Sequence, residues 1–168
     1  MPCQDFYPYY NRLMKLEQKA AKLLTKQNKA ISIAESCTGG LLSSKLTSIP
    51  GSSKFLKLGI VSYSNESKVK LLKVPKKKID TYGAVSDQTA RAMASGARRI
   101  LKTDFGIGIT GIAGPAGGTK NKPVGLTFVA ISTKEGDLCL KCNFKRTRKS
   151  IREQASNTAL KLLIKFLS

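Results

Sequence analysis

Short apolar segments with strand character alternate with amphipathic segments along the chain, and this alternation restricts the fold more than any other feature of the sequence. Strand patterns lie at 31–35, 57–63, 104–110, 124–132 and 138–144, and helical patterns lie at 11–27, 38–46, 64–74, 86–102 and 148–167. The last two strands flank a short turn and predict an antiparallel hairpin, whereas helices separate the earlier strands. We therefore predict an α/β fold, a three-layer αβα sandwich with a mixed sheet of about five strands.

The length of 168 residues fits one domain, and no linker or internal repeat divides the chain. We predict a single domain over residues 1–168, with 1–10 as a loose N-terminal extension and 75–85 as a basic loop. No apolar run approaches the roughly 18 residues that a membrane span needs. The first residues lack the basic and apolar regions of a signal peptide, so we expect a cytoplasmic protein without membrane contacts.

Thirty Lys and Arg residues against ten Asp and Glu residues give the chain a formal net charge of +20. A charge of this size normally indicates a polyanionic partner such as nucleic acid. The basic residues extend from Arg12 to Lys165, however, and the few aromatic residues do not alternate with them as a base-stacking surface requires. We therefore do not expect nucleic acid as the main partner. A lysine-rich surface that attracts a phosphorylated small molecule explains the charge equally well.

The four cysteines are Cys3, Cys37, Cys139 and Cys142, and the last two have the C-x-x-C spacing of some metal and redox sites. Both lie in the last predicted strand, where residues three apart point to opposite faces of the sheet. The chain contains no histidine and no second cysteine pair at metal-binding spacing. We therefore expect reduced cysteines, no metal site and no cofactor.

Three unusual segments follow predicted strands: Glu-Ser-Cys-Thr-Gly-Gly at 35–40, Tyr-Ser-Asn-Glu-Ser-Lys at 63–68, and a Gly-rich loop at 111–118. Ligands of α/β proteins gather at the carboxyl ends of the strands, so these segments predict a site there. Gly39 and Gly40 let backbone N–H groups approach a phosphate or an oxyanion closely. Neither Gly-rich segment has the spacing of a P-loop or of a dinucleotide-binding turn, and each is also explained as a tight turn.

Ser36 is the candidate nucleophile, and the absence of histidine leaves a lysine, a tyrosine or a carboxylate as the type of base. Tyr63 and Lys68 are the nearest such residues after the second strand. Lys68 lies near a helix N-terminus, whose positive dipole end disfavours a protonated amine. The residues alone leave open that Ser36 only caps the next helix and that Lys68 is a surface lysine. Glu35 is expected to pair with a cation or to hydrogen-bond the loop backbone.

Several separated motifs in these segments resemble the C-terminal domain of the competence/damage-inducible protein CinA. They are AESCTGGLLSSKLTSIPGSSKFLKLGIVSYSNESKVKLLKV, YGAVSDQTARAMASGAR and DFGIGITGIAGPAGGTKNKPVGLTFVAIS, in the same order. The resemblance covers roughly residues 10–166 and includes no second CinA domain, so we expect the stand-alone form of the domain. That form implies a nicotinamide-nucleotide amidase, which hydrolyses the carboxamide of nicotinamide mononucleotide (NMN) to nicotinate mononucleotide and ammonia.

The resemblance implies a serine amidase that works without histidine, because Ser36 matches the nucleophile and Tyr63 and Lys68 match the tyrosine and lysine beside it. On this pattern Lys68, directly or through Tyr63, takes the proton from Ser36 Oγ. Backbone N–H groups at 37–40 then stabilise the oxyanion. The residues expected to contact the substrate are Glu35, Cys37, Thr38, Gly39, Gly40, Gly111 and Gly114.

An arginine near the start of the last helix completes the set that the resemblance implies. Arg148 is the expected residue, with Arg146 and Arg152 as alternatives, and it orients the tyrosine or binds the substrate phosphate. The sequence does not decide whether 38–40 or 111–118 holds that phosphate. The resemblance also implies self-association into a homo-oligomer. Two alternatives to the amidase remain, namely an inactive paralog that binds nucleotides and a basic nucleic-acid-binding protein.

Overall fold

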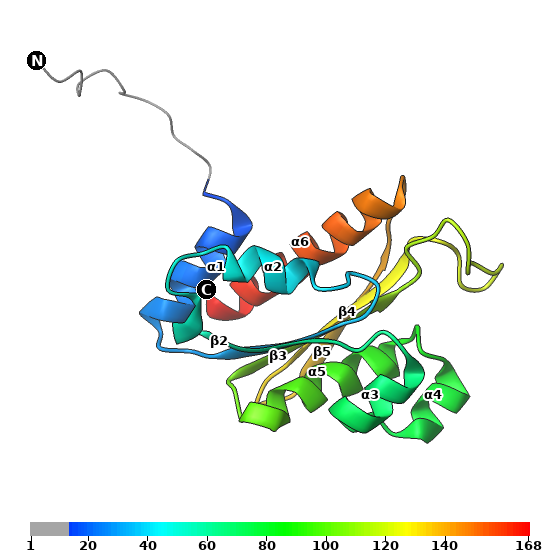
Figure 1. Cartoon of the computed structure of the whole chain (residues 1–168), viewed down its shortest axis with the longest axis horizontal. Helices are drawn as coiled ribbons and strands as arrows, with labels where there is room; N and C mark the ends of the chain where they lie inside the picture. Colours follow the sequence, from blue (N-terminus) through cyan, green and yellow to red (C-terminus); the bar gives the residue numbers. More distant parts are fainter. Residues whose placement is uncertain (1–13) are drawn as a thin grey trace, which may run out of the picture.

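A five-stranded sheet with the strand order β2-β1-β3-β4-β5 forms the middle layer of the protein (Figure 1). Its strands are β1 (Ile31–Glu35), β2 (Leu56–Val61), β3 (Phe105–Gly111), β4 (Leu126–Ser132) and β5 (Asp137–Asn143). β1 pairs in parallel with β2 and β3, whereas β3–β4 and β4–β5 are antiparallel pairs. The mixed sheet and the C-terminal hairpin are therefore confirmed.

Helices cover both faces of this sheet (Figure 1). On one face lie α1 (Leu16–Lys26), α2 (Leu41–Thr47) and α6 (Arg148–Leu167), and on the other lie α3 (Asn65–Leu72), α4 (Lys76–Tyr82) and α5 (Asp87–Leu101). A 3-10 turn at Ser52–Lys54 precedes β2. Alternate residues of each buried strand face opposite layers, as the period of two requires: Ile33 packs in the cluster with α1, α2 and α6, and Ala34 in the cluster with α5. The predicted three-layer αβα sandwich is confirmed.

The computed structural model describes residues 14–168. The predicted extension at 1–10, the predicted helix start at residue 11 and Cys3 lie outside the described residues. Within residues 14–168, the helices are too short or too polar to form a transmembrane segment. The same part of the chain holds no cluster of three or more side chains suited to bind a metal ion.

Several predicted boundaries differ from the structure. The segment predicted as a basic loop contains α4, because Ile79 is buried against the α5 layer and gives a short helix one apolar anchor among its lysines. The helix predicted from residue 38 begins only at Leu41, because Gly39 and Gly40 take left-handed backbone angles, with φ of 59° and 90°. β2 ends at Val61, two residues before the predicted Tyr63, because the chain turns there toward α3.

Glycines on β3 allow α5 to lie directly on the sheet. A Cβ atom at Gly108 would lie 2.3 Å from the carbonyl oxygen of Ala90, and one at Gly106 would lie 2.1 Å from that of Ala94. These distances are shorter than any normal contact, so only glycine fits at these positions. The close approach fixes the height of α5 over the sheet and therefore places the segment that precedes it, at 83–86, beside the end of β3.

Candidate active site

A pocket of about 270 Å³ opens where β1, β2 and β3 end. It is lined by residues from 36–37, 63–68, 84–85 and 110–117, together with Arg148. β1, β2 and β3 run in the same direction, so their carboxyl ends meet at one edge of the sheet. The three segments that the sequence singled out therefore converge as expected for an α/β protein.

Ser36 is the first residue after β1 and lies at the pocket with only 8% of its surface exposed. Its backbone N–H donates to the carbonyl of Ile109 at 3.0 Å, which ties it to the neighbouring strand β3. Its carbonyl accepts the N–H of Gly39 at 3.1 Å and closes a tight turn. The left-handed angles of the two glycines then return the chain to α2. The turn thus presents Ser36 Oγ to the pocket.

Lys68, on the first turn of α3, is almost completely buried, with 1% of its surface exposed. Its Nζ donates to Ser36 Oγ at 3.1 Å and to the carbonyl of Ser62 at 2.8 Å. The carbonyls of Tyr63 and Ser64 lie further from Nζ, at 3.2 and 3.5 Å. Within residues 14–168, no carboxylate lies within ion-pair distance of Lys68. Lys68 is therefore a buried amine that contacts a serine hydroxyl, and not a surface lysine.

Burial lowers the pKa of Lys68 from its ordinary value of 10.5, because a charged amine loses its hydration there, while the neighbouring Cys37 acts weakly in the opposite direction. The contacts of Nζ suit a neutral amine, which has two N–H donors and one lone pair. In the charged form Nζ donates to Ser36 Oγ and to the carbonyls of Ser62 and Tyr63. Loss of one proton leaves two N–H groups for the two carbonyls and a lone pair directed at Ser36 Oγ. The geometry supports a serine with a lysine base.

Cys37 lies next to Ser36 and also lines the pocket, but its environment disfavours a thiolate. Burial is the main cause that raises the pKa of its thiol to about 11, and the negative charge of Glu35 adds to the effect. The opposing influences of its own backbone N–H, Lys68 and Arg148 are smaller. Cys37 therefore remains a neutral thiol near pH 7, and it is a poor nucleophile.

Arg148 and Tyr63 meet at the mouth of the pocket. Arg148, the first residue of α6, donates from Nη1 to the carbonyl of Gly114 at 2.7 Å and from Nη2 to the phenol oxygen of Tyr63 at 3.4 Å. Tyr63 is 64% exposed, and within residues 14–168 its carbonyl, but not its phenol, is hydrogen-bonded to Lys68. Of the three arginines that the sequence proposed, Arg148 is the one that lines the pocket.

Four residues expected to contact the substrate do not line this pocket: Glu35, Thr38, Gly39 and Gly40. Glu35 is fully buried, and its carboxylate accepts the N–H groups of Gly40, Leu42 and Ser43 and the hydroxyl of Ser43, at 2.7 to 3.1 Å. Glu35 therefore caps the start of α2, which agrees with the expectation that it hydrogen-bonds the loop backbone. The expected substrate contact of Glu35 is corrected on this basis.

In the turn at 36–40, some backbone N–H groups already have a hydrogen-bond acceptor. The N–H of Gly39 bonds to Ser36 and that of Gly40 to Glu35. The N–H groups of Cys37 and Thr38 have no acceptor among residues 14–168. Thr38 is fully buried and does not line the pocket, so the set of oxyanion donors expected at 37–40 is narrowed to the N–H of Cys37.

Sequence reasoning did not name several residues that line the pocket, among them Asn65, Val85 and Thr110. Asn65 and Thr110 lie within or beside segments that the sequence had singled out, so their place after strands was the available signal. Thr110 donates from Oγ1 to the carbonyl of Ala84 at 2.8 Å, which holds the 84–85 wall against β3. No sequence pattern pointed to Val85, because the segment 84–85 lines the pocket only once α5 packs on β3.

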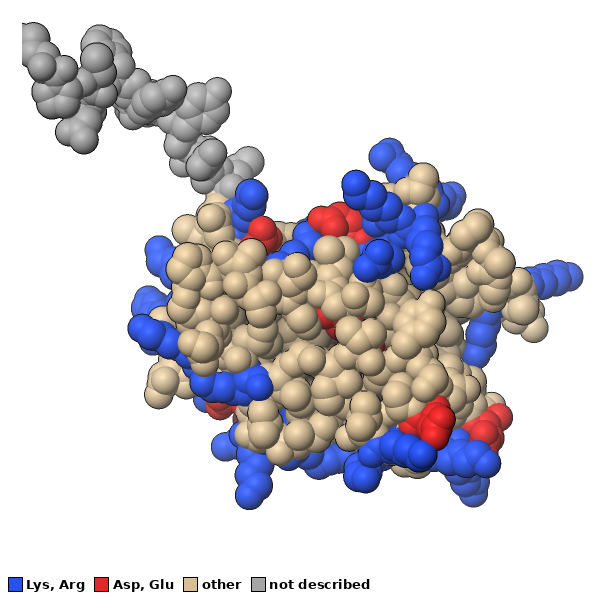
Figure 2. Space-filling model, viewed as in Figure 1, with Lys and Arg blue, Asp and Glu red and all other residues tan. Residues whose placement is uncertain are grey.

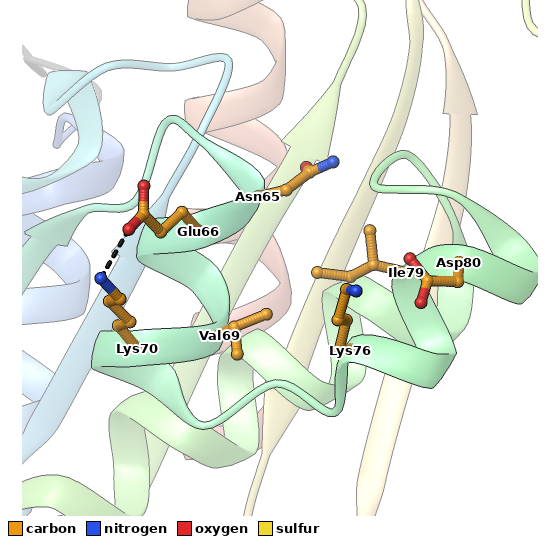
Figure 3. Close-up of a pocket in the computed structure, with 7 residues that line it drawn as sticks. All are labelled: Asn65, Glu66, Val69, Lys70, Lys76, Ile79 and Asp80. Carbon is orange, nitrogen blue, oxygen red and sulfur yellow. Dashed lines mark ion pairs between the residues drawn. The ribbon is translucent and has the colours of Figure 1, made fainter.

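A second hollow of about 360 Å³ lies between α3 and α4 (Figure 3). Val69 and Ile79 form its apolar floor, and on its rim Glu66 is paired with Lys70 at 2.6 Å. Asn65 lines both hollows, so they adjoin. The groove contains neither the serine nor the buried lysine, and the pocket at Ser36 is therefore the better candidate for catalysis.

Lys and Arg side chains surround the outline of the molecule in Figure 2, whereas the middle of that face is largely uncharged. The +20 net charge is thus not gathered into one stripe on this face. Cys139 and Cys142 on β5 are both partly exposed. Only Cys139 packs in the cluster with α5, as expected for residues on opposite faces of the strand.

Residues 13–167 match the sequence profile of the CinA C-terminal domain. The chain is 47% identical over 148 residues to a CinA-like protein of Endomicrobium trichonymphae, which covers 88% of this chain and 35% of that protein. It is 46% identical over 150 residues to a putative competence-damage inducible protein of Caldicellulosiruptor bescii, covering 89% of this chain and 36% of that protein. The chain thus spans about a third of the length of these relatives.

Solved structures give the same result. The competence/damage inducible protein CihA from Agrobacterium tumefaciens superposes with a TM-score of 0.86 at 39% identity, covering 91% of this chain and 96% of that one. A CinA superfamily protein from Klebsiella pneumoniae superposes with a TM-score of 0.87 at 28% identity, covering 90% and 95%. On the basis of the matched profile and these relatives, the chain belongs to the CinA C-terminal domain family.

Proposed function

We propose that the chain is an amidohydrolase that converts nicotinamide mononucleotide to nicotinate mononucleotide and ammonia, a step of pyridine nucleotide salvage. The observation that carries the proposal is the 3.1 Å contact between Lys68 Nζ and Ser36 Oγ at a pocket. A serine beside a buried amine has the nucleophile and the base that acyl transfer needs without histidine. Membership of the CinA family supports this activity, since the resemblance described above implies it.

The pocket supports a small substrate. Its volume of about 270 Å³ lies near the lower end of the range for small-molecule sites. Such a space suits a nicotinamide ring with part of its ribose, and the phosphate then lies toward the mouth. Lys68 and Arg148 are the two basic side chains among the lining residues, and since Lys68 acts as a neutral base, Arg148 is the cation left for the phosphate.

In the proposed acylation step, neutral Lys68 takes the proton of Ser36 Oγ while Oγ attacks the carboxamide carbon. The carbonyl π electrons move to oxygen, and the N–H of Cys37 is the backbone donor available for that oxyanion. Lys68 Nζ lies within direct reach of Oγ, so the step needs no relay through the Tyr63 phenol.

Collapse of the tetrahedral intermediate re-forms the carbonyl and breaks the C–N bond. The Lys68 ammonium gives its proton to the departing nitrogen, which leaves as ammonia, and the nicotinoyl group remains on Ser36 as an ester. Water then attacks the ester with Lys68 as base, the C–O bond to Oγ breaks, and Oγ regains a proton. Both half-reactions use the same amine, and the products are the carboxylic acid and the free serine.

Arg148 is proposed to hold the substrate phosphate together with the loop at 111–117. This loop lines the pocket, whereas Thr38, Gly39 and Gly40 do not. A guanidinium presents several N–H donors in a plane that suits a phosphate. Contacts with Gly114 and the Tyr63 phenol already orient it toward the mouth.

Ammonia release from NMN by the purified protein tests the proposal, with Ser36→Ala and Lys68→Ala as the informative variants. Lys70→Ala is the matched control, because Lys70 lies on the same helix, is exposed and pairs only with Glu66 among the described residues. We expect release by the wild type and by Lys70→Ala, and none by the other two. A wild type that binds NMN without releasing ammonia would instead indicate an inactive nucleotide-binding paralog.

Nucleic-acid binding remains a second candidate because of the +20 charge. Binding through phosphates weakens steeply as salt rises, because condensed counterions are released, and it would persist in Ser36→Ala. Amidase activity should change little with salt and should disappear in that variant. Titration of single- and double-stranded oligonucleotides at two salt concentrations separates the two candidates.

A further inference from the structure

The turn that carries Ser36 is held by a charged side chain that the proposed reaction does not use. Arg152 lies one helical turn after Arg148 on α6 and points to the serine turn rather than to the pocket. Its Nε and Nη2 both donate to the carbonyl oxygen of Thr38, at 3.1 and 2.7 Å. The same carbonyl also accepts the N–H of Leu41 at 3.3 Å.

Glu35 holds the same turn, residues 36–40, at the end that leads into α2. Its buried carboxylate accepts the N–H groups of Gly40, Leu42 and Ser43 at the start of α2. The peptides between Ser36 and Gly40 therefore lie between an anchored cation and an anchored anion. A peptide plane that turns over would exchange its N–H for its C=O, so fixing the carbonyl of Thr38 limits how the neighbouring planes can rotate.

The charge of Arg152 also matters for an oxyanion beside this turn. The carboxylate of Glu35 is buried in the turn and would disfavour a second negative charge nearby. The guanidinium of Arg152, bound to the Thr38 carbonyl, supplies the opposite charge. Arg148 lies toward the mouth, where it binds Gly114 and the Tyr63 phenol, and within residues 14–168 it makes no hydrogen bond to the turn.

We propose that Arg152 is a positioning residue: it holds the Thr38 carbonyl so that the N–H of Cys37 stays available to the oxyanion formed at Ser36. The choice of NMN as the substrate in this inference rests on the proposed amidase function. The role of Arg152 does not, because any acyl or phosphonyl transfer to Ser36 needs the same oxyanion donor. Arg152 thus acts through the turn and does not touch the substrate.

The experiment measures two rates in Arg152→Ala, Arg152→Lys and the control Lys149→Ala, which removes one exposed charge from the same helix. One rate is ammonia release from NMN. The other is the labelling of Ser36 by a fluorophosphonate, followed by intact mass, in which Oγ bonds to phosphorus, fluoride leaves and Lys68 takes the proton. Thermal unfolding of each variant reports any loss of folded protein.

We expect Arg152→Ala to lower kcat and the labelling rate about 100-fold, the loss typical of a displaced catalytic group, with KM nearly unchanged. Arg152→Lys should lose less, because one donor to Thr38 remains, and millimolar guanidinium should partly restore Arg152→Ala. Lys149→Ala should match the wild type. If Arg152→Ala does not fold, Arg152→Lys provides the same comparison.

Two results would overturn the inference. One is a folded Arg152→Ala protein with the kcat and the labelling rate of the wild type. If Arg152→Ala does not fold, the same result with Arg152→Lys overturns the inference. The other is a variant that changes KM alone, which would make Arg152 a substrate-binding residue. A wild type that is labelled at Ser36 but releases no ammonia would refute the amidase proposal only, and the labelling rates would then decide the role of Arg152.

Discussion

Glu35→Ala should destabilise the protein strongly, because the Glu35 carboxylate is the only acceptor that the structure gives to three backbone N–H groups at the start of α2. These belong to Gly40, Leu42 and Ser43, at 3.1, 3.1 and 2.8 Å, and the Ser43 hydroxyl donates to the same carboxylate at 2.7 Å. Loss of an ordinary helix cap costs about 1 kcal/mol, and each buried donor left without a partner costs about 1–3 kcal/mol.

Because water can enter the space left by the side chain and satisfy part of these donors, we expect a loss of about 4 kcal/mol in the free energy of unfolding. At about 2–4 °C per kcal/mol for a chain of this length, the midpoint of thermal unfolding should fall by about 8–16 °C. Glu35→Gln should lose about half as much free energy, because its amide oxygen still accepts while its NH₂ group meets N–H donors.

Urea unfolding followed by circular dichroism measures these differences, and Glu66→Gln is the matched control. Glu66 pairs with Lys70 at 2.6 Å with 69% of its side chain exposed, so its loss should change the free energy of unfolding by less than about 0.5 kcal/mol. A Glu35→Ala protein within about 1 kcal/mol of the wild type would refute the reasoning, since that is the effect of an average substitution.

Four further predictions concern the site and the core. Because burial lowers the pKa of Lys68 below 10.5 and the base must be neutral, kcat/KM should fall as the pH falls through the lowered pKa, and a pH–rate profile checks this. The unfolded lysine binds its proton more tightly, so Lys68 should also make the free energy of unfolding rise with pH between the lowered pKa and 10.5. Arg148→Ala should raise KM for NMN by about 10- to 100-fold while nicotinamide riboside, which has no phosphate, is affected far less in the same assay. Gly108→Ala should cost more than about 2 kcal/mol in urea unfolding, since its Cβ would lie 2.3 Å from the Ala90 carbonyl.

The sequence predicted the sheet and most helices because their apolar periods are regular. α5 illustrates this, since the helix predicted at 86–102 covers Asp87–Leu101 in the structure, where the hydroxyl of the cap Ser86 accepts the N–H of Thr89. α4 was missed because its burial depends on one residue, Ile79, among lysines, and a single apolar residue has no period. Its helix forms because α5 covers Ile79, which is a tertiary effect that local patterns do not contain.

At the site, residue types and their places after strands brought Ser36, Lys68 and the arginines of α6 into consideration. The sequence alone could not assign different roles to the arginines, because Arg148 and Arg152 are one turn apart and share a helix face. The structure separates them by partner, with Arg148 on Gly114 and Arg152 on Thr38. It also moves Glu35 from the expected substrate contacts to the cap of α2, a role that only the fold of the turn defines.

The absence of histidine places one demand on this fold, which is a lysine that can be neutral near pH 7. An exposed lysine cannot meet it, because hydration stabilises the ammonium, and a lysine paired with a carboxylate is held in its charged form. Lys68 avoids both conditions, since it is 1% exposed and its partners are backbone carbonyls and Ser36 Oγ. Carbonyls accept N–H donors from the amine in either protonation state. The chain turn after β2 that supplies these carbonyls is therefore as necessary to the proposed base as Lys68 itself.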